Sequence, residues 1–250
     1  MHNLDEIKIR IHSFESGGTV DGPGIRFVIF TQGCPLRCQY CHNPDTWNTK
    51  GGREISGSDL VKEILKYKTF MQFSKGGVTF SGGEPLVQKE SLIPVFKALK
   101  KEGIHIALDT AGTTDIDDTT KELLNFVDLV MLDVKHLDPI GHKNLTGQTN
   151  ERCFNFLNLL KEKHIKTWIR WVVVPNINDT EEYADRFAKF VKPYENVELV
   201  EILPYHQSGI YKWKELGIPY PLSHIKNTPS REQIEELASL LESQFIKTLY

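Results

Sequence analysis

Short apolar runs alternate with amphipathic stretches along most of this chain. The runs are nearly continuous and rich in β-branched residues, a pattern typical of parallel strands that are buried on both faces. Such runs lie at Arg26–Gln32, Gly77–Phe80, His105–Leu108, Leu129–Leu132, Lys166–Val174 and Val197–Leu203. The pattern therefore predicts six parallel strands.

The stretches between the runs have the apolar spacing of amphipathic helices. The first begins at Ser58, a residue type that caps helix N-termini. The others lie at Glu90–Lys101, Thr119–Asn125, Glu151–Lys163, Thr180–Val191 and from about Pro229 toward the C-terminus. Strands that alternate with helices predict right-handed βαβ crossovers.

Both a doubly wound sheet and an incomplete barrel fit this element order. The unusual segments TQGC, SGGEP, DTAG, DVKH, VPN and LPYH each follow a run directly. Active sites of parallel α/β folds gather at this carboxyl edge of the strands. We therefore favour an α/β fold with a partial (β/α)6 TIM-like barrel. Because no linker interrupts the pattern, we expect one domain over residues 1–250, with a core of about 20–206 and a C-terminal helical extension of about 207–250.

The composition argues against nucleic acid and membranes as binding partners. The 250 residues are 40% hydrophobic and 25% charged, with a formal net charge of −3. This balance gives no broad attraction to nucleic acid or to an anionic membrane. No apolar run approaches the ~20 residues of a membrane span, and the N-terminus lacks the apolar core of a signal peptide. We expect a cytoplasmic protein with no nucleic-acid or membrane partner.

Three of the four cysteines, Cys34, Cys38 and Cys41, lie within eight residues, whereas Cys153 lies on a predicted helix as a buried filler. Tight clusters in a cytosolic chain more often bind metal than form disulfides. Three thiolates leave one position open, either in a zinc site that His42 would complete or in a [4Fe–4S] cluster. Zinc sites usually combine two separated ligand pairs, so we favour the cluster. A non-catalytic electron carrier would usually supply all four ligands itself.

The C-x3-C-x2-C spacing, with Tyr40 before the third cysteine, resembles the signature of radical S-adenosylmethionine (SAM) enzymes. The stretches GTVDGPGIRFVIFTQGCPLRCQYCHNPDTW, VTFSGGEPL, LDTAG, DLVMLDVK and LPYH resemble the glycyl-radical-enzyme activases, in particular those that act on pyruvate formate-lyase. These blocks run from Ile11 to about Pro219. Only 40 residues separate Cys41 from Gly82, and none is cysteine, which matches the short type without a ferredoxin-like insert.

The resemblance implies a radical SAM fold and a definite reaction. Reduction of the cluster would cleave SAM to methionine and a 5′-deoxyadenosyl radical, which abstracts hydrogen from a backbone glycine of pyruvate formate-lyase. The electron would come from reduced flavodoxin or ferredoxin. Activation of a different glycyl radical enzyme, another radical SAM reaction, and a non-catalytic iron–sulfur or zinc protein are the alternatives. We expect a monomer, because the largest contact required is with the protein substrate.

The resemblance also implies site residues. The cluster ligands are Cys34, Cys38 and Cys41. The residues expected at SAM are Tyr40, Cys41, His42, Gly82, Gly83, Glu84, Asp133, Val134, Lys135, His136, Leu137, Arg170 and His206. Oxygens of Asp109, Thr110, Met131 and Asp133 would hold a monovalent cation.

Three positions in these motifs add detail. Asp21, in the glycine-rich VDGPG segment, is expected near the substrate glycine. Ala111 stands where the family often has asparagine. Arg170 lies inside a buried strand, where an unpaired charge is costly, so its partner must be a carboxylate of SAM or of the protein.

Overall fold

The computed structural model describes residues 3–250 and divides into two compact units. Unit 1 comprises Met1–Pro35 and Thr46–Met131, and unit 2 comprises Leu36–Asp45 and Leu132–Tyr250. The boundary crosses the cysteine-rich loop. None of the helices in the described chain combines the length and hydropathy that a membrane span needs.

Unit 1 contains a mixed sheet. Its strands are β1 (Lys8–Gly18), β2 (Arg26–Thr31), β3 (Arg53–Ser56), β4 (Gly77–Gly82) and β5 (Ile106–Thr110). They lie in the order β3-β1-β2-β4-β5, and the β2–β4 and β4–β5 pairs are parallel, as predicted. Strands β1 and β3 were not predicted. They pair antiparallel with each other, and β1 also pairs antiparallel with β2. In β1, buried Ile9 and Ile11 alternate with more exposed neighbours, which is the period of a strand with one buried face.

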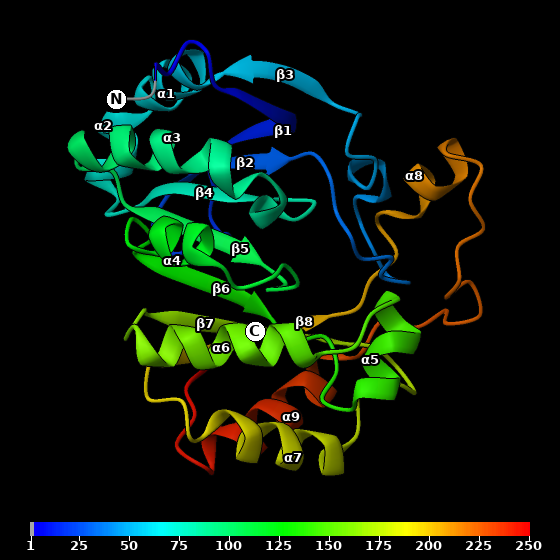
Figure 1. Ribbon diagram of the computed structural model, residues 1–250. Helices are drawn as coiled ribbons and strands as arrows, with labels where there is room; N and C mark the ends of the chain where they lie inside the picture. The colour runs from blue at the N-terminus through cyan, green and yellow to red at the C-terminus, as the bar shows by residue number, and fades with distance from the viewer. Residues whose placement is uncertain (1–2) are drawn as a thin grey trace. The chain divides into compact units, whose positions relative to one another are not determined.

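The helices of unit 1 pack beside one another (Figure 1). They are α1 (Gly57–Leu65), α2 (Lys68–Phe73), α3 (Lys89–Lys101) and α4 (Asp118–Leu124). Helix α3 contacts both α1 and α4. The rings of Phe80 on β4 and Phe96 on α3 lie 4.6 Å apart, so α3 also covers the sheet through its apolar face.

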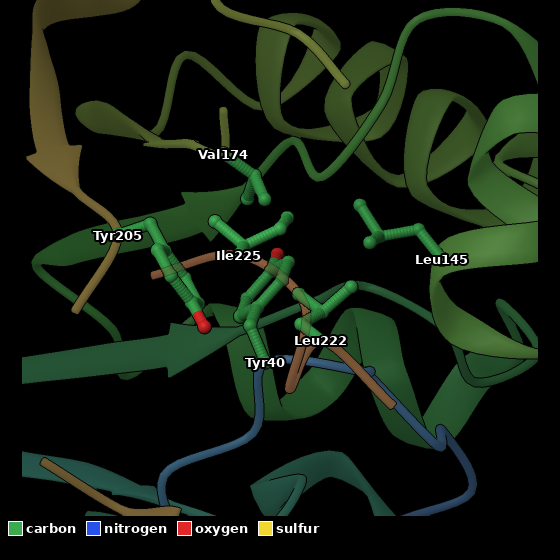
Figure 2. Packing of buried hydrophobic residues seen from close by; sticks show 6 residues of the cluster. All are labelled: Tyr40, Leu145, Val174, Tyr205, Leu222 and Ile225. Carbon is green, nitrogen blue, oxygen red and sulfur yellow. The ribbon is translucent and has the colours of Figure 1, made fainter. Parts of the chain in front are cut away.

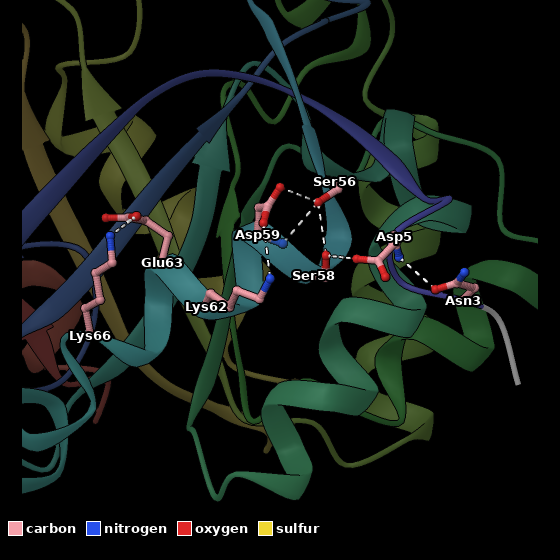
Figure 3. Close-up of polar contacts among 8 residues, drawn as sticks. All are labelled: Asn3, Asp5, Ser56, Ser58, Asp59, Lys62, Glu63 and Lys66. Atoms are coloured by element: carbon pink, nitrogen blue, oxygen red, sulfur yellow. Dashed lines mark hydrogen bonds and ion pairs between the residues drawn. The ribbon is translucent and has the colours of Figure 1, made fainter.

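The N-terminus of α1 differs from the prediction (Figure 3). The cap is Ser56, whose hydroxyl accepts a hydrogen bond from the Asp59 amide at 3.1 Å. Ser58 was the predicted cap, but it lies inside the first turn and donates to Asp5. The reason is that β3 runs directly into α1, so the last extended residue, Ser56, is the one beside the unpaired amides.

Unit 2 is built on parallel strands and a helical layer. Strands β7 (Thr167–Val173), β8 (Val197–Pro204) and β9 (Thr248–Leu249) pair in that order, all parallel. The helices are α5 (Pro139–Thr146), α6 (Glu151–Glu162), α7 (Glu181–Val191), α8 (Ile210–Glu215) and α9 (Arg231–Glu242). Helices α7 and α9 lie side by side (Figure 1). Strand β6 (Leu129–Asp133) crosses the unit boundary along the chain, and α5, α8 and β9 were not predicted.

The prediction that Cys153 is a buried filler is confirmed. Cys153 is only 1% exposed and fills the core under α6. Trp168 and Trp171 point to opposite faces of β7: Trp171 is buried and stacks on Phe187 at 4.7 Å, whereas Trp168 is half-buried and donates to Glu198.

A hydrophobic cluster gathers segments of unit 2 that are far apart in the sequence (Figure 2). Tyr40 comes from the cysteine-rich loop and Leu145 from α5. The remaining members follow β7, β8 and α8: Val174, Tyr205, Leu222 and Ile225. The cluster therefore anchors the part of the cysteine-rich loop that belongs to this unit.

Candidate active site

In unit 1, the glycine-rich turn after β4 lies against the loop that leads to Cys34. The Gly83 amide donates to the carbonyl of Thr31 at 3.0 Å, and the Glu84 amide donates to the carbonyl of Gly33 at 2.8 Å. Parallel pairing of β2 with β4 causes this contact, because it sets Thr31 opposite Gly82. The two motifs that the sequence places 40 residues apart thus share one edge.

Only glycine fits this turn. Gly82 has a φ of 112°, and a Cβ there would lie 2.2 Å from the Thr31 amide nitrogen. A Cβ on Gly83 would lie 2.3 Å from the carbonyl oxygen of Gly33 and 3.3 Å from the Cβ of Cys34. The close approach of backbone to the cysteine loop is therefore built into the sequence.

The Glu84 side chain is fully buried and engaged within unit 1. Its carboxylate accepts hydrogen bonds from the Thr110 hydroxyl at 2.5 Å, the Ala111 amide at 2.9 Å and the Leu86 amide at 3.2 Å. Burial raises the pKa of Glu84 to about 7, while these donors oppose the shift. The side chain thus fastens the turn to the end of β5.

The expected cation ligands of unit 1 follow the same edge. Asp109 accepts a hydrogen bond from the Ser81 hydroxyl at 2.6 Å, which links β5 to β4. The Thr110 hydroxyl, besides donating to Glu84, accepts from the amide of Gly112 at 3.0 Å. Met131 is buried in β6.

Asp21 is held through its main chain. Its carbonyl accepts from the Thr79 hydroxyl at 2.7 Å, and the same hydroxyl accepts from Nε of Arg26 at 2.8 Å. Arg26 is 0% exposed and also donates to the carbonyls of Val78 and Pro23. This buried arginine, at the start of a predicted strand, was not singled out as a site residue.

In unit 2, the loop with Cys38 and Cys41 is pinned from both sides. The amides of Arg37 and Gln39 donate to the carbonyls at the end of α5, at 2.8 and 2.9 Å. The indole nitrogen of Trp213 on α8 donates to the carbonyl of Cys41 at 2.8 Å. Lys212 adds bonds to Asn43 and Asp45 at 2.8 and 3.0 Å. Lys212 and Trp213 were not among the predicted site residues.

Tyr40 and Cys38 are buried. The Tyr40 side chain is 7% exposed and lies in the hydrophobic cluster, with the ammonium of Lys135 5.6 Å from its ring centroid. Any contact of Tyr40 with a cofactor must therefore come from its main chain. Burial raises the pKa of Cys38 to about 12, although the charge of Lys135 opposes this shift.

His42 and His206 lie together. Their ring centroids are 4.2 Å apart, and Nε2 of His42 donates to the carbonyl of His206 at 3.1 Å. Burial lowers the pKa of His42 below its usual value, which favours the neutral ring at pH 7.

The remaining expected SAM residues of unit 2 lie after β6 and on β7. Lys135 forms an ion pair with Asp133 at 2.8 Å. Burial alone would lower the pKa of Lys135, but Asp133 raises it well above its usual value. Arg170 pairs with Glu201, opposite it on β8, at 2.6 Å. The predicted carboxylate partner of Arg170 is therefore a protein residue.

The residues present fit an iron–sulfur cluster and SAM. The cysteines of the described chain form no disulfide, and the loop carries three thiols, that of Cys34 in unit 1 and those of Cys38 and Cys41 in unit 2. Thiolate sulfur is the ligand that iron–sulfur clusters use, and metal binding drives deprotonation of a thiol such as Cys38. Because Gly82 and Gly83 lack a Cβ, the turn approaches the backbone that leads to Cys34 closely, and its carbonyls lie near that cysteine.

Comparison with known proteins decides the family. The model of the radical SAM superfamily matches residues 28–188. The pyruvate formate-lyase 1-activating enzyme of Escherichia coli (strain K12) is 48% identical over 242 residues, which cover 96% of this chain and 98% of that protein. The chain belongs to the pyruvate formate-lyase-activating enzymes, within the radical SAM superfamily. The pyruvate formate-lyase-activating enzyme of Clostridium pasteurianum is also 48% identical, over 93% of this chain and 98% of that protein.

Solved structures agree on the fold. Streptococcus suis SuiB, crystallised with its precursor peptide SuiA, superposes with a TM-score of 0.68 at 18% identity, over 92% of this chain and 49% of that chain. The predicted α/β class with mostly parallel strands is confirmed. Membership of the radical SAM superfamily implies a [4Fe–4S] cluster and SAM, and so favours iron–sulfur over the zinc alternative for the three cysteines.

Proposed function

We propose that this radical SAM enzyme activates pyruvate formate-lyase by generating a radical on one of its backbone glycines. Relatives at 48% identity over nearly the whole chain carry this activity in their names. The single structural observation that supports it most is the hydrogen bonding of the Gly82–Glu84 turn to the loop before Cys34. It sets a ligand-accepting backbone beside a cluster ligand.

We assign the cluster to Cys34, Cys38 and Cys41. When bound, the reduced cluster supplies the electron that cleaves SAM to methionine and the 5′-deoxyadenosyl radical that takes the glycine hydrogen. Trp213 and the α5 carbonyls hold the loop that carries two of these cysteines, so the ligands are oriented before metal arrives.

The SAM contacts fall into two groups. In unit 1, main-chain carbonyls of Gly82, Gly83 and Glu84 accept hydrogen bonds from the amino group of SAM. In unit 2, the contacts come from the main chain of Tyr40, the His42–His206 pair, the segment Asp133–Leu137 and Arg170. Carboxylate and carbonyl oxygens are hard ligands, so Asp109, Thr110, Met131 and Asp133 remain our proposed monovalent cation ligands.

The protein substrate and the electron donor complete the proposal. Asp21 lies on the substrate side, held by Thr79 through its carbonyl. A reduced flavodoxin or ferredoxin supplies the electron through a weak, transient contact. We place the enzyme in the cytoplasm, where thiols stay reduced, and expect it to act as a monomer.

The test compares two buried cysteines of unit 2. Wild type, Cys38→Ala and Cys153→Ala are reconstituted anaerobically with iron and sulfide, reduced with dithionite and given SAM, and 5′-deoxyadenosine is measured by chromatography. We expect product from wild type and Cys153→Ala and none from Cys38→Ala. Equal product from all three variants contradicts the cysteine assignment.

Adding purified pyruvate formate-lyase tests the partner. Electron spin resonance should then show a glycyl radical with the two active proteins. Cleavage of SAM without this radical, together with a radical on another glycyl radical enzyme, would assign the chain to that other substrate.

A further inference from the structure

The segment between β6 and α5, Val134–Asp138, has neither helical nor sheet hydrogen bonding over its middle residues. Its two ends are fixed by regular structure. The Val134 amide donates to the carbonyl of Arg170 at 3.0 Å, and Asp138 caps α5 by accepting from Ile140 and Gly141 at 2.9 Å. The conformation of His136 and Leu137 must therefore be set by something else.

Two side chains from other helices hold these middle residues. The side-chain amide of Asn150, at the start of α6, donates to the carbonyls of His136 at 3.1 Å and Leu137 at 2.7 Å. The hydroxyl of Tyr183, on α7, accepts from the Leu137 amide at 2.9 Å. Three consecutive polar groups of the main chain are thus satisfied by two side chains.

Both side chains are rigidly placed. Asn150 is 4% exposed and Tyr183 is 6% exposed. The Tyr183 ring packs between His136 and Trp171, with ring centroids 5.3 and 5.7 Å away. A side chain held by packing transmits the position of its helix to the backbone it binds.

We propose that Asn150 and Tyr183 are positioning residues that fix the Asp133–Leu137 segment in the conformation that binds SAM. The inference rests on the proposed function, because it assigns this segment to SAM. A segment already ordered in the free protein loses less entropy on binding, so loss of either anchor weakens SAM binding without removing a direct contact.

The first test removes one hydroxyl. Tyr183→Phe keeps the ring packing and deletes the acceptor for Leu137. The matched control is Tyr194→Phe, which deletes a hydroxyl of the same unit that donates to Asn158 at 3.0 Å, away from the segment. Amide hydrogen exchange of the peptide over Val134–Asp138 is measured in the metal-free proteins, and the Kd for SAM by calorimetry in the cluster-loaded proteins.

We expect Tyr183→Phe to speed exchange of this peptide and to raise the Kd for SAM about fivefold, the loss of roughly one hydrogen bond. Iron content should match wild type, and Tyr194→Phe should change neither quantity. An unchanged Kd in Tyr183→Phe, or equal changes in both variants, overturns the inference.

Asn150→Ala gives an independent test should Tyr183→Phe fold poorly. It should raise exchange and Kd in the same direction, since it frees two carbonyls. If wild type cleaves SAM and both variants have the same Kd for SAM as wild type, the inference fails but the proposed function stands. If loaded wild type neither binds nor cleaves SAM, the proposed function fails and the inference with it.

Discussion

The two units bury arginine in different ways. Arg26 of unit 1 is fully buried, and its partners are uncharged: the hydroxyl of Thr79, main-chain carbonyls and the ring of His105 at 3.2 Å. The carboxylates of Asp128 and Asp21 raise its pKa, but they offset the effect of burial only in part. Arg170 of unit 2 instead faces Glu201 across two paired strands at 2.6 Å.

The same contrast holds for other buried charges. Glu84 of unit 1 is surrounded by neutral donors, and burial raises its pKa to about 7. Burial likewise lowers the pKa of Arg26 to about 10. Lys135 of unit 2, next to Asp133, has its pKa raised well above the usual value. A counterion in direct contact keeps a buried group charged, whereas neutral hydrogen-bond partners and other nearby charges do not fully offset burial.

The largest expected effect is at the ion pair. Arg170→Met leaves the Glu201 carboxylate buried without its partner, so the free energy of unfolding should fall by about 3–5 kcal/mol. Chemical denaturation measures this loss. The double variant Arg170→Met with Glu201→Leu should recover most of it, because no charge is then left behind. A double variant as unstable as the single one contradicts the comparison.

Glu84 should give unit 1 a pH dependence opposite in sign to that of a carboxylate paired with a counterion. Its pKa is raised from 4.5 to about 7 on folding, so the folded state binds the proton more tightly. The resulting stabilisation is full below pH 4.5 and is lost as pH rises toward 7, by about 3 kcal/mol in total. Denaturation curves across this range should show the slope in wild type and a flatter line in Glu84→Gln. If the stability of wild type and of Glu84→Gln changed equally with pH, the buried Glu84 carboxyl would not be the cause.

Removal of Arg26 should cost less than removal of Arg170. Arg26→Met takes away hydrogen bonds to Thr79 and two carbonyls but strands no carboxylate, so we expect a loss of about 1–2 kcal/mol. The measurement is again chemical denaturation at neutral pH. A loss equal to that of Arg170→Met would show that Arg26 has a charged partner in solution.

The smallest effect on stability is expected at Thr79, which joins Arg26 to Asp21. Thr79→Val should lower the free energy of unfolding by about 1 kcal/mol and loosen the Asp21 main chain. Glycyl radical yield on pyruvate formate-lyase should then fall, while SAM cleavage without the substrate protein stays near wild type. Thr79→Ser is the control that keeps the hydroxyl. A normal radical yield in Thr79→Val removes Asp21 from the substrate side.

Local patterns in the sequence predicted much of this molecule. The six buried strands, the motifs at their ends and the carboxylate partner of Arg170 follow from short apolar runs and from the cost of burying a charge. Strands β1 and β3 were not predicted because they pair residues far apart in the sequence, such as Ile11 and Arg53. Such pairing leaves little signal in the local sequence. The burial of the Tyr40 side chain was not predicted for a similar reason, since its neighbours come from four other segments of the chain.

The contacts of Asn150 and Tyr183 with the Val134–Asp138 segment could not be predicted from local sequence patterns either. The local pattern around Asn150 indicates the start of a helix, and that around Tyr183 indicates the apolar face of a helix. The structure has both features. Nothing in either local pattern indicates that they meet at His136 and Leu137. Only the packing of α6 and α7 brings them there.

The bond from Trp213 to the carbonyl of Cys41 has an optical consequence. Iron–sulfur clusters absorb broadly at the wavelengths where indole emits, and this indole adjoins a cluster ligand. Binding of the cluster should therefore quench the fluorescence of Trp213, one of the four tryptophans of the chain. A Trp213→Phe comparison would turn the intrinsic emission of the protein into a continuous record of cluster assembly and of its loss in air.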